Sequence, residues 1–150
     1  MNEEFQWTVR VTGAGTNHCA AYARRHQIQL GAPISFDLEH GETTALEYFL
    51  AAVGGDIVSG LFLRAKRERI ELDHVEATVA CSLNNPLTFL DVIGEHGDPG
   101  IRDVRVTAYI STLSDEGEIH QLWEDTLRKS PMVQTLRKAV ALDLSYKVVL

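Results

Sequence analysis

Hydrophobic and polar residues alternate with a period of two in the first part of the chain, a pattern typical of β-strands with one buried face. The alternation is regular in residues 5–12, imperfect in residues 18–30 and regular again in residues 34–39. Gly13 follows the first run, which suits the end of a strand. The pattern therefore predicts an antiparallel meander in the N-terminal third of the chain.

The pattern changes in residues 45–63, where nearly every position is apolar or small. Glu47, Asp56 and Ser59 are the exceptions, and the threonines at 43–44 can cap the start of a helix. The uninterrupted apolar runs are short, and Asp56 would lie near the middle of a bilayer, where carboxylates are rare. We therefore expect a buried core helix and not a membrane span.

The second half of the chain is predicted to contain several strands, then a pair of helices, and then a last strand. Strands are predicted in residues 75–83 and 101–112, with a short strand in residues 86–93 and a last strand in residues 140–148. One predicted helix places these residues on a single face: Ile119, Leu122, Trp123, Thr126 and Leu127. Ser130 and Pro131 suit the start of a second, short helix that runs to about Ala139. These elements predict one α+β domain over residues 1–150, with antiparallel strands around a long buried helix and a C-terminal helix pair.

The central helix also bears on assembly. A helix that is apolar nearly all round must be covered on every side, and 150 residues supply little cover. Ala51, Gly55 and Ser59 recur at every fourth position, so another helix can approach closely there, either the second helix or a symmetry mate. We therefore expect a homodimer.

The composition narrows the class of protein. The formal net charge is −7, which argues against a nucleic-acid surface, and 45% hydrophobic with 23% charged residues is typical of a globular domain. The first residues lack the basic and apolar segments of a signal peptide, so we expect a cytoplasmic protein without a membrane partner.

Most reactive side chains show no pattern that indicates chemistry. The six histidines lack metal-ligand spacing, although His26 and His40 flank the predicted third strand. Cys81 lies on the apolar face of its strand, as a buried and inert thiol does, and the setting of Cys19 is ambiguous. The sequence predicts no metal site and no cofactor.

Asp56 is the most informative residue, because a carboxylate buried without a partner costs free energy or shifts its pKa. Three roles are open from the sequence. Asp56 can be a functional carboxylate that faces a cavity, a structural cap on another segment of backbone, or a residue reached by water.

Two segments carry longer motifs. Residues 45–56 read Ala-Leu-Glu-Tyr-Phe-Leu-Ala-Ala-Val-Gly-Gly-Asp, and residues 130–136 read Ser-Pro-Met-Val-Gln-Thr-Leu. The first resembles the central-helix motif of the OsmC/Ohr family, the osmotically inducible and organic hydroperoxide resistance proteins, which reads approximately Pro-Glu-x-Leu-Leu-x-Ala-Ala-x-x-x-Cys. The second is similar to the family's Cys-Pro-Val-x-x-x-Leu. The resemblance in element order covers nearly the whole chain and implies an OsmC-like fold and an intertwined homodimer.

Members of that family reduce organic hydroperoxides with a peroxidatic cysteine, assisted by an arginine and a glutamate, and a second cysteine closes a disulfide. Carried over to this sequence, the two cysteines fall on Asp56 and Ser130. The glutamate falls on Leu46, with Glu47 one position later, and residues 26–63 contain no arginine. All four catalytic positions depart from the family pattern.

The resemblance and these departures lead to a hypothesis. The chain is an OsmC-like protein that has lost thiol peroxidase activity and keeps a pocket in which Asp56 and Ser130 face one another. The pocket would bind a small apolar or cationic ligand, with Asp56 as its anchor and with Glu47, Phe49 and Trp123 around it.

Two alternatives remain open. Asp56 can act as a general base on water or on Ser130 in a hydrolase-like site, or the pocket has filled in and the protein is structural. The sequence assigns no catalytic residue.

Overall fold

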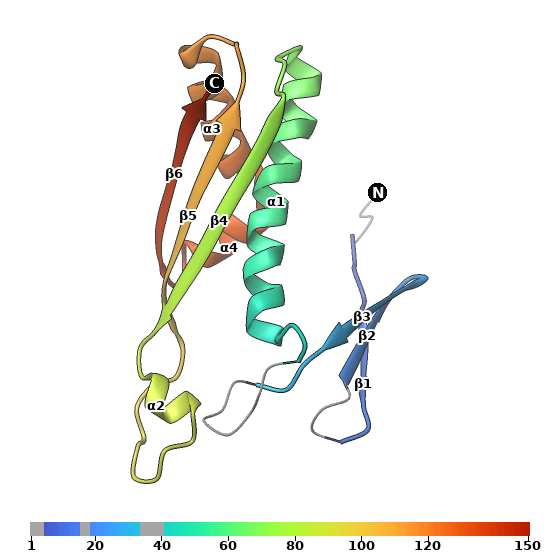
Figure 1. Cartoon of the computed structure of the whole chain (residues 1–150), viewed down its shortest axis with the longest axis vertical. Helices are drawn as coiled ribbons and strands as arrows, with labels where there is room; N and C mark the ends of the chain where they lie inside the picture. The colour runs from blue at the N-terminus through green and yellow to red at the C-terminus, as the bar shows by residue number, and fades with distance from the viewer. Residues whose placement is uncertain (1–4, 16–18, 34–40) are drawn as a thin grey trace. The chain divides into compact units, whose positions relative to one another are not determined.

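The computed structural model describes residues 5–15, 19–33 and 41–150, which group into two compact units, Met1–Tyr48 and Phe49–Leu150 (Figure 1). The first unit holds three short strands and the start of the long helix α1. The second holds the rest of α1, a second sheet and three further helices.

The N-terminal unit contains the predicted antiparallel meander, with strands β1 (Arg10–Gly13), β2 (Cys19–Ala23) and β3 (His26–Leu30) in the order β1-β2-β3. The prediction of one strand over residues 5–12 was too long, because only its end pairs with β2. The imperfect alternation of residues 18–30 arises because Arg24 adopts a φ of 55° and reverses the chain between two strands. The strand predicted for residues 34–39 lies outside the described residues.

Helix α1 (Ala45–Glu68) confirms the predicted central helix, and its last turn is basic. Its inner face is buried through residues spaced three and four apart: Val53, Gly54, Ile57, Leu61 and Ala65. Its outer face is exposed along Ala51, Ala52, Gly55, Ser59, Phe62 and Leu63. A single chain therefore leaves this face of the helix uncovered, in line with the expectation that 150 residues supply too little cover for it. By length and composition α1 could cross a membrane, but its inner face packs in a protein core.

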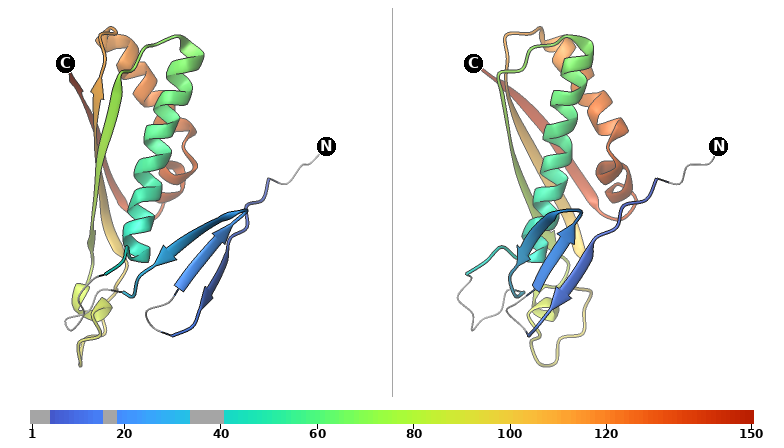
Figure 2. Two further views of the ribbon diagram at one scale, coloured as in Figure 1. Left: turned by 45° about the vertical axis from the view of Figure 1, so that its right-hand side comes forward. Right: turned by 90° about the vertical axis from the view of Figure 1, so that its right-hand side faces the viewer.

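The second unit is a layer of helices on one face of a three-stranded sheet (Figure 2). Strands β4 (His74–Leu83), β5 (Ile101–Ser111) and β6 (Ala141–Val149) lie in the order β4-β5-β6. β4 and β5 are antiparallel, but β6 is parallel to β5, unlike the expected all-antiparallel arrangement. The helices between β5 and β6 return the chain to the end of the sheet where β5 begins, so the two strands run in the same direction.

The core of the second unit is formed by apolar side chains from α1, the sheet and the helix pair. Its fully buried members include Ile57, Leu61, Val104, Val106, Ile110, Ile119 and Leu122. Helix α3 (Glu116–Lys129) buries the predicted apolar face, which confirms that reading of its periodicity. Helix α4 (Pro131–Leu136) starts where predicted and ends one turn early.

The segment that follows β4 corrects one prediction. Residues 86–93 do not form a strand, because α2 (Pro86–Phe89) begins there. Asn85 caps this short helix by accepting hydrogen bonds from the backbone N–H groups of Leu87 and Thr88, and Pro86 fits the first helical position. The capping asparagine and the proline therefore favour the start of a helix more strongly than the apolar residues favour a strand.

Candidate functional site

Helix α1 starts with a reciprocal cap. The Thr44 hydroxyl oxygen accepts the Glu47 backbone N–H at 3.3 Å, and the Glu47 carboxylate accepts the Thr44 backbone N–H at 3.1 Å. The Thr44 hydroxyl also donates to the same carboxylate at 2.8 Å. This is a capping box. Glu47, a predicted ligand-binding residue, therefore holds the start of the helix.

Asp56 lies midway along α1 and is half-buried. One turn later, a Cβ on Gly60 would lie 3.0 Å from Cγ2 of Thr126 on α3, so the absence of a side chain lets α3 pass close to α1. This close approach brings the end of α3 and the start of α4 next to Asp56.

Ser130 joins the two C-terminal helices, because it is both the C-cap of α3 and the N-cap of α4. Its hydroxyl oxygen accepts the Val133 backbone N–H at 3.0 Å, and its hydroxyl hydrogen is donated to Oδ2 of Asp56. Ser130 is 5% exposed. The hydroxyl thus has one partner as an acceptor and one as a donor, and it ties α4 to the middle of α1.

The two oxygens of Asp56 differ. Oδ2 holds the Ser130 hydroxyl, whereas Oδ1 has no hydrogen-bond partner among the described residues and is not one of their buried unpaired atoms. No ion pair within the described part of the chain includes Asp56. The site therefore presents an accessible carboxylate oxygen whose charge no cation of the described chain balances.

Two predicted pocket residues lie elsewhere in the core. Trp123 is buried and packs on Tyr146, with ring centroids 5.4 Å apart, and Phe49 packs against the core cluster. Neither has a described contact with the Asp56 carboxylate. A hollow of about 610 Å³ lies at the opposite end of α3, beside Ser114 and Tyr146, and is not part of this site.

Both cysteines are free and half-buried. Cys81 packs against the core, and burial, followed by the negative charge of Asp103, raises the pKa of its thiol above 9.0. This agrees with the prediction of an inert thiol. Cys19 lies on β2 in the N-terminal unit.

Sequence reasoning missed two contributors to the site. The Val133 N–H orients the Ser130 hydroxyl, and the contact of Gly60 with Thr126 sets the helix separation. Ser130 was recognised as a cap, and a cap accepts from the second or third residue of its helix, so the Val133 contact could have been inferred. The Gly60–Thr126 contact had no local signal.

The family model described as OsmC-like protein matches residues 37–145, which is most of the chain. The chain belongs to the OsmC family. No curated protein matches the sequence. The fold of this OsmC-like chain is similar to that of an OsmC-like protein from Mycoplasma pneumoniae, with a TM-score of 0.80 and 17% identity over 98% of this chain and 99% of the other.

Two further structures are also similar to this OsmC-like chain. An organic hydroperoxide resistance protein from Legionella pneumophila has a TM-score of 0.70 and 19% identity, over 97% of this chain and 99% of the other. A putative organic hydroperoxide resistance protein from Vibrio cholerae, with captopril bound in one of its active sites, has a TM-score of 0.66 and 14% identity, over 97% and 94%. At these identities the similarity shows the α+β fold with its long central helix.

Proposed function

We propose that this OsmC-like protein binds a small ligand through Asp56 and does not reduce hydroperoxides by thiol chemistry. The observation that carries the proposal is the hydrogen bond from Ser130 to Asp56. These are the two positions at which the resemblance places the family's cysteines. The pair keeps the proximity that a disulfide would need, with oxygen in place of sulfur.

The chemistry of the side chains supports the loss of peroxidase activity. A thiolate is the nucleophile that attacks a peroxide and forms a sulfenate, and neither a carboxylate nor a hydroxyl does so. The raised pKa of Cys81 keeps that thiol protonated at neutral pH. Cys19 and Cys81 lie on strands of different units and not at the two motif positions.

The free oxygen of Asp56 indicates what the ligand would supply. Oδ1 accepts no hydrogen bond from the described residues, and Ser130 has already donated its hydrogen to Oδ2. A ligand with an ammonium group or another N–H donor would donate a hydrogen bond to this free oxygen. The captopril complex of the Vibrio cholerae neighbour supports a small-molecule site in this fold, since that protein holds an organic molecule in an active site.

We also propose that the chain acts as a homodimer. The outer face of α1 presents Ala51, Gly55 and Ser59 to solvent, and a Cβ on Gly55 would meet nothing within 4 Å. Phe62 and Leu63 extend this exposed face. A second copy of the chain would cover it.

A hydrolase-like role is less well supported. The bond from Ser130 to Asp56 has the form of a nucleophile and its base, but Ser130 is 5% exposed and its oxygen already accepts the Val133 N–H. A substrate carbonyl would have to reach a buried oxygen that already uses one of its two lone pairs to accept the Val133 N–H.

Protein-observed NMR with butylammonium and butyrate tests the ligand proposal. We expect butylammonium to shift resonances around Asp56, with butyrate causing no such shift. Asp56→Asn keeps the shape and an oxygen for Ser130 but removes the charge, so it should abolish the shifts. Asp143→Asn, an exposed carboxylate on β6, is the matched control. Equal shifts in wild type and Asp56→Asn, or no shifts in wild type, would overturn the proposal.

A further inference from the structure

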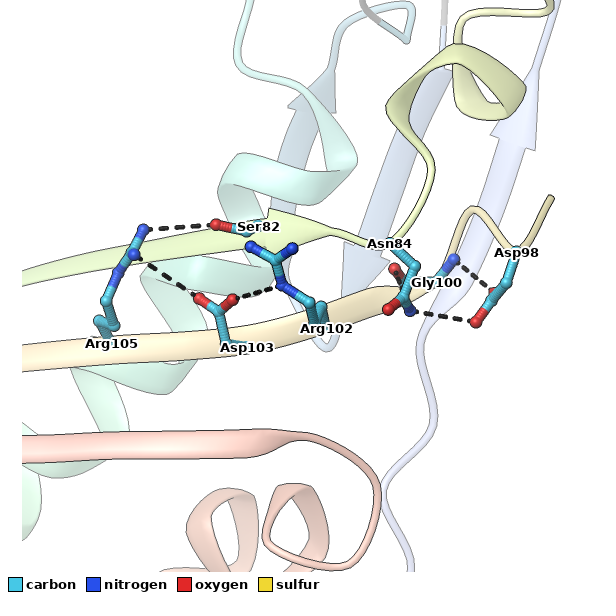
Figure 3. Close-up of polar contacts among 7 residues, drawn as sticks. All are labelled: Ser82, Asn84, Asp98, Gly100, Arg102, Asp103 and Arg105. Atoms are coloured by element: carbon cyan, nitrogen blue, oxygen red, sulfur yellow. Dashed lines mark hydrogen bonds and ion pairs between the residues drawn. The ribbon is translucent and has the colours of Figure 1, made fainter. Parts of the chain in front are cut away.

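The connection between β4 and β5, residues 84–100, leaves the sheet and returns beside its own start. The Asn84 backbone N–H donates to the Gly100 carbonyl at 2.9 Å. The Asn84 side-chain amide donates to the same carbonyl at 3.1 Å and to Oδ2 of Asp98 at 3.0 Å (Figure 3). Oδ1 of Asp98 accepts the Gly100 N–H at 2.7 Å. These bonds close the neck of a compact loop.

The interior of this loop is also held by hydrogen bonds. Asn85 caps α2, and its amide nitrogen donates to Oε2 of Glu95 at 3.2 Å. A Cβ on Gly97 would lie 2.3 Å from the same nitrogen, so the loop closes on Asn85 only because residue 97 is a glycine. The side chains that point outward are therefore presented in fixed positions.

The outward side chains are apolar and their surroundings are acidic. Leu87, Phe89 and Ile93 are exposed, and Ile93 is exposed as fully as in an extended chain, at 101%. The segment contains three carboxylates, Asp91, Glu95 and Asp98, and neither lysine nor arginine. We call residues 84–100 the acidic loop. A rigid, exposed apolar surface of this kind is typical of a docking site.

The end of α1 has the opposite character. Phe62 and Leu63 are exposed there, and four cations follow at Arg64, Lys66, Arg67 and Arg69. Within the described residues none of these cations forms an ion pair, and Nε of Arg64 is buried without a hydrogen-bond partner. We call residues 62–69 the basic helix end.

The two surfaces lie at opposite ends of the second unit. β4 packs along α1, since a Cβ on Gly54 would lie 2.8 Å from the Val79 side chain. β4 starts shortly after the helix ends and runs back beside it, so the acidic loop lies beyond the first part of α1 (Figure 1). Ten strand residues span about 33 Å, which separates the two surfaces within one chain.

We propose that the acidic loop of one copy binds the basic helix end of a second copy. The proposal rests on the homodimer proposed above. A two-fold axis perpendicular to α1 places the basic helix end of each copy beside the acidic loop of the other, so one geometry forms the contact twice. Opposite charges then surround two apolar patches, Phe62 with Leu63 and Leu87 with Ile93, and both patches are removed from water.

Sedimentation equilibrium of the full chain tests this contact. Ile93→Lys places a cation in the acidic loop at a position that packs on nothing in one chain, and we expect the dimer Kd to rise about tenfold or more. Lys66→Glu combined with Arg67→Glu should weaken the dimer similarly. All three substitutions together should weaken the dimer less than the two glutamates alone, because the new lysine then faces carboxylates. Leu150→Lys is the matched control, since Leu150 follows the last strand and is also fully exposed, at 103%.

The outcomes separate the contact from the dimer. A wild-type dimer whose Kd is unchanged by Ile93→Lys and by the paired glutamates overturns the docking contact and leaves the homodimer standing. A wild type that stays monomeric overturns both. Butylammonium binding at Asp56 is measured independently of either result.

Discussion

Two half-buried carboxylates in the second unit show different environments for a negative charge. Asp103 on β5 lies between two guanidinium groups, with Nε of Arg102 at 3.0 Å from Oδ2 and Nη1 of Arg105 at 3.8 Å from Oδ1 (Figure 3). Asp56 on α1 has one neutral partner, the Ser130 hydroxyl. The charge of Asp103 is balanced within the chain, whereas that of Asp56 is left for water or a ligand. This difference is the reason that we propose a binding role for Asp56 and not for Asp103.

The largest change in stability should follow from loss of the Ser130 hydroxyl. Ser130→Ala removes the cap of α4 and the only described partner of Asp56. We expect the free energy of unfolding to fall by about 2 kcal/mol in urea denaturation. Ser145→Ala, on the exposed face of β6, is the control. A Ser130→Ala variant as stable as this control would show that the hydroxyl does not tie the helices together.

Removal of the Asp56 side chain should cost less. In Asp56→Ala the Ser130 hydroxyl still accepts the Val133 N–H, and an unbalanced charge is lost from a half-buried position. We expect a change within about 1 kcal/mol of wild type, because carboxylates kept for binding contribute little to the fold. A loss above that of Ser130→Ala would make Asp56 a structural residue.

Asp103→Ala should have a smaller effect, despite its two ion pairs. The side chains of Arg102 and Arg105 are 60% and 53% exposed, so water solvates both cations when the carboxylate is gone. We expect a change of about 0.5 kcal/mol or less, reduced further in high salt. Urea denaturation at two salt concentrations checks this, and a large, salt-independent loss would contradict the comparison.

The charge of Asp103 should also be detectable at Cys81. Burial is the main cause of the raised pKa of this thiol and the Asp103 charge is the second, so Asp103→Asn should lower that pKa slightly. The pH dependence of Cys81 alkylation, followed by mass spectrometry, gives the midpoint, with Asp143→Asn as control. An unchanged midpoint would show that the carboxylate is screened from the thiol.

The same raised pKa has a consequence for stability. The folded chain retains the Cys81 proton more strongly than the unfolded chain. The contribution of Cys81 to the free energy of unfolding is therefore fully present below the ordinary thiol pKa of 9.0. It is lost as the pH rises through the raised pKa of the thiol in the folded chain.

Local pattern was sufficient to predict much of the fold. A long run of apolar and small residues identified α1, and the 3.6-residue period identified α3. Strand alternation identified β4 and β5, and the Ser130–Pro131 pair located the start of α4. Alternation failed at residues 86–93, where the cap formed by Asn85 outweighs it. The parallel pairing of β6 was not predictable, because strand direction depends on the path of the helices between the strands.

The site depended on information beyond local pattern. Asp56 was conspicuous as a carboxylate in an apolar helix, but its partner is distant in the sequence. Only the resemblance to the family's two motifs identified Ser130 as the partner of Asp56. The one-sided exposure of α1 and the fixed acidic loop depend on packing and on hydrogen bonds such as those of Asn84 and Asn85, which no period in the sequence encodes.

The most direct test of the proposed function is organic hydroperoxide consumption by the purified protein with a dithiol reductant, measured beside a Cys19→Ser, Cys81→Ser variant. The Asp56–Ser130 pair predicts that the wild type consumes no more peroxide than the cysteine-free variant. Turnover by the wild type that disappears in the variant would contradict this, because it would mean that Cys19 or Cys81 performs the peroxidase chemistry.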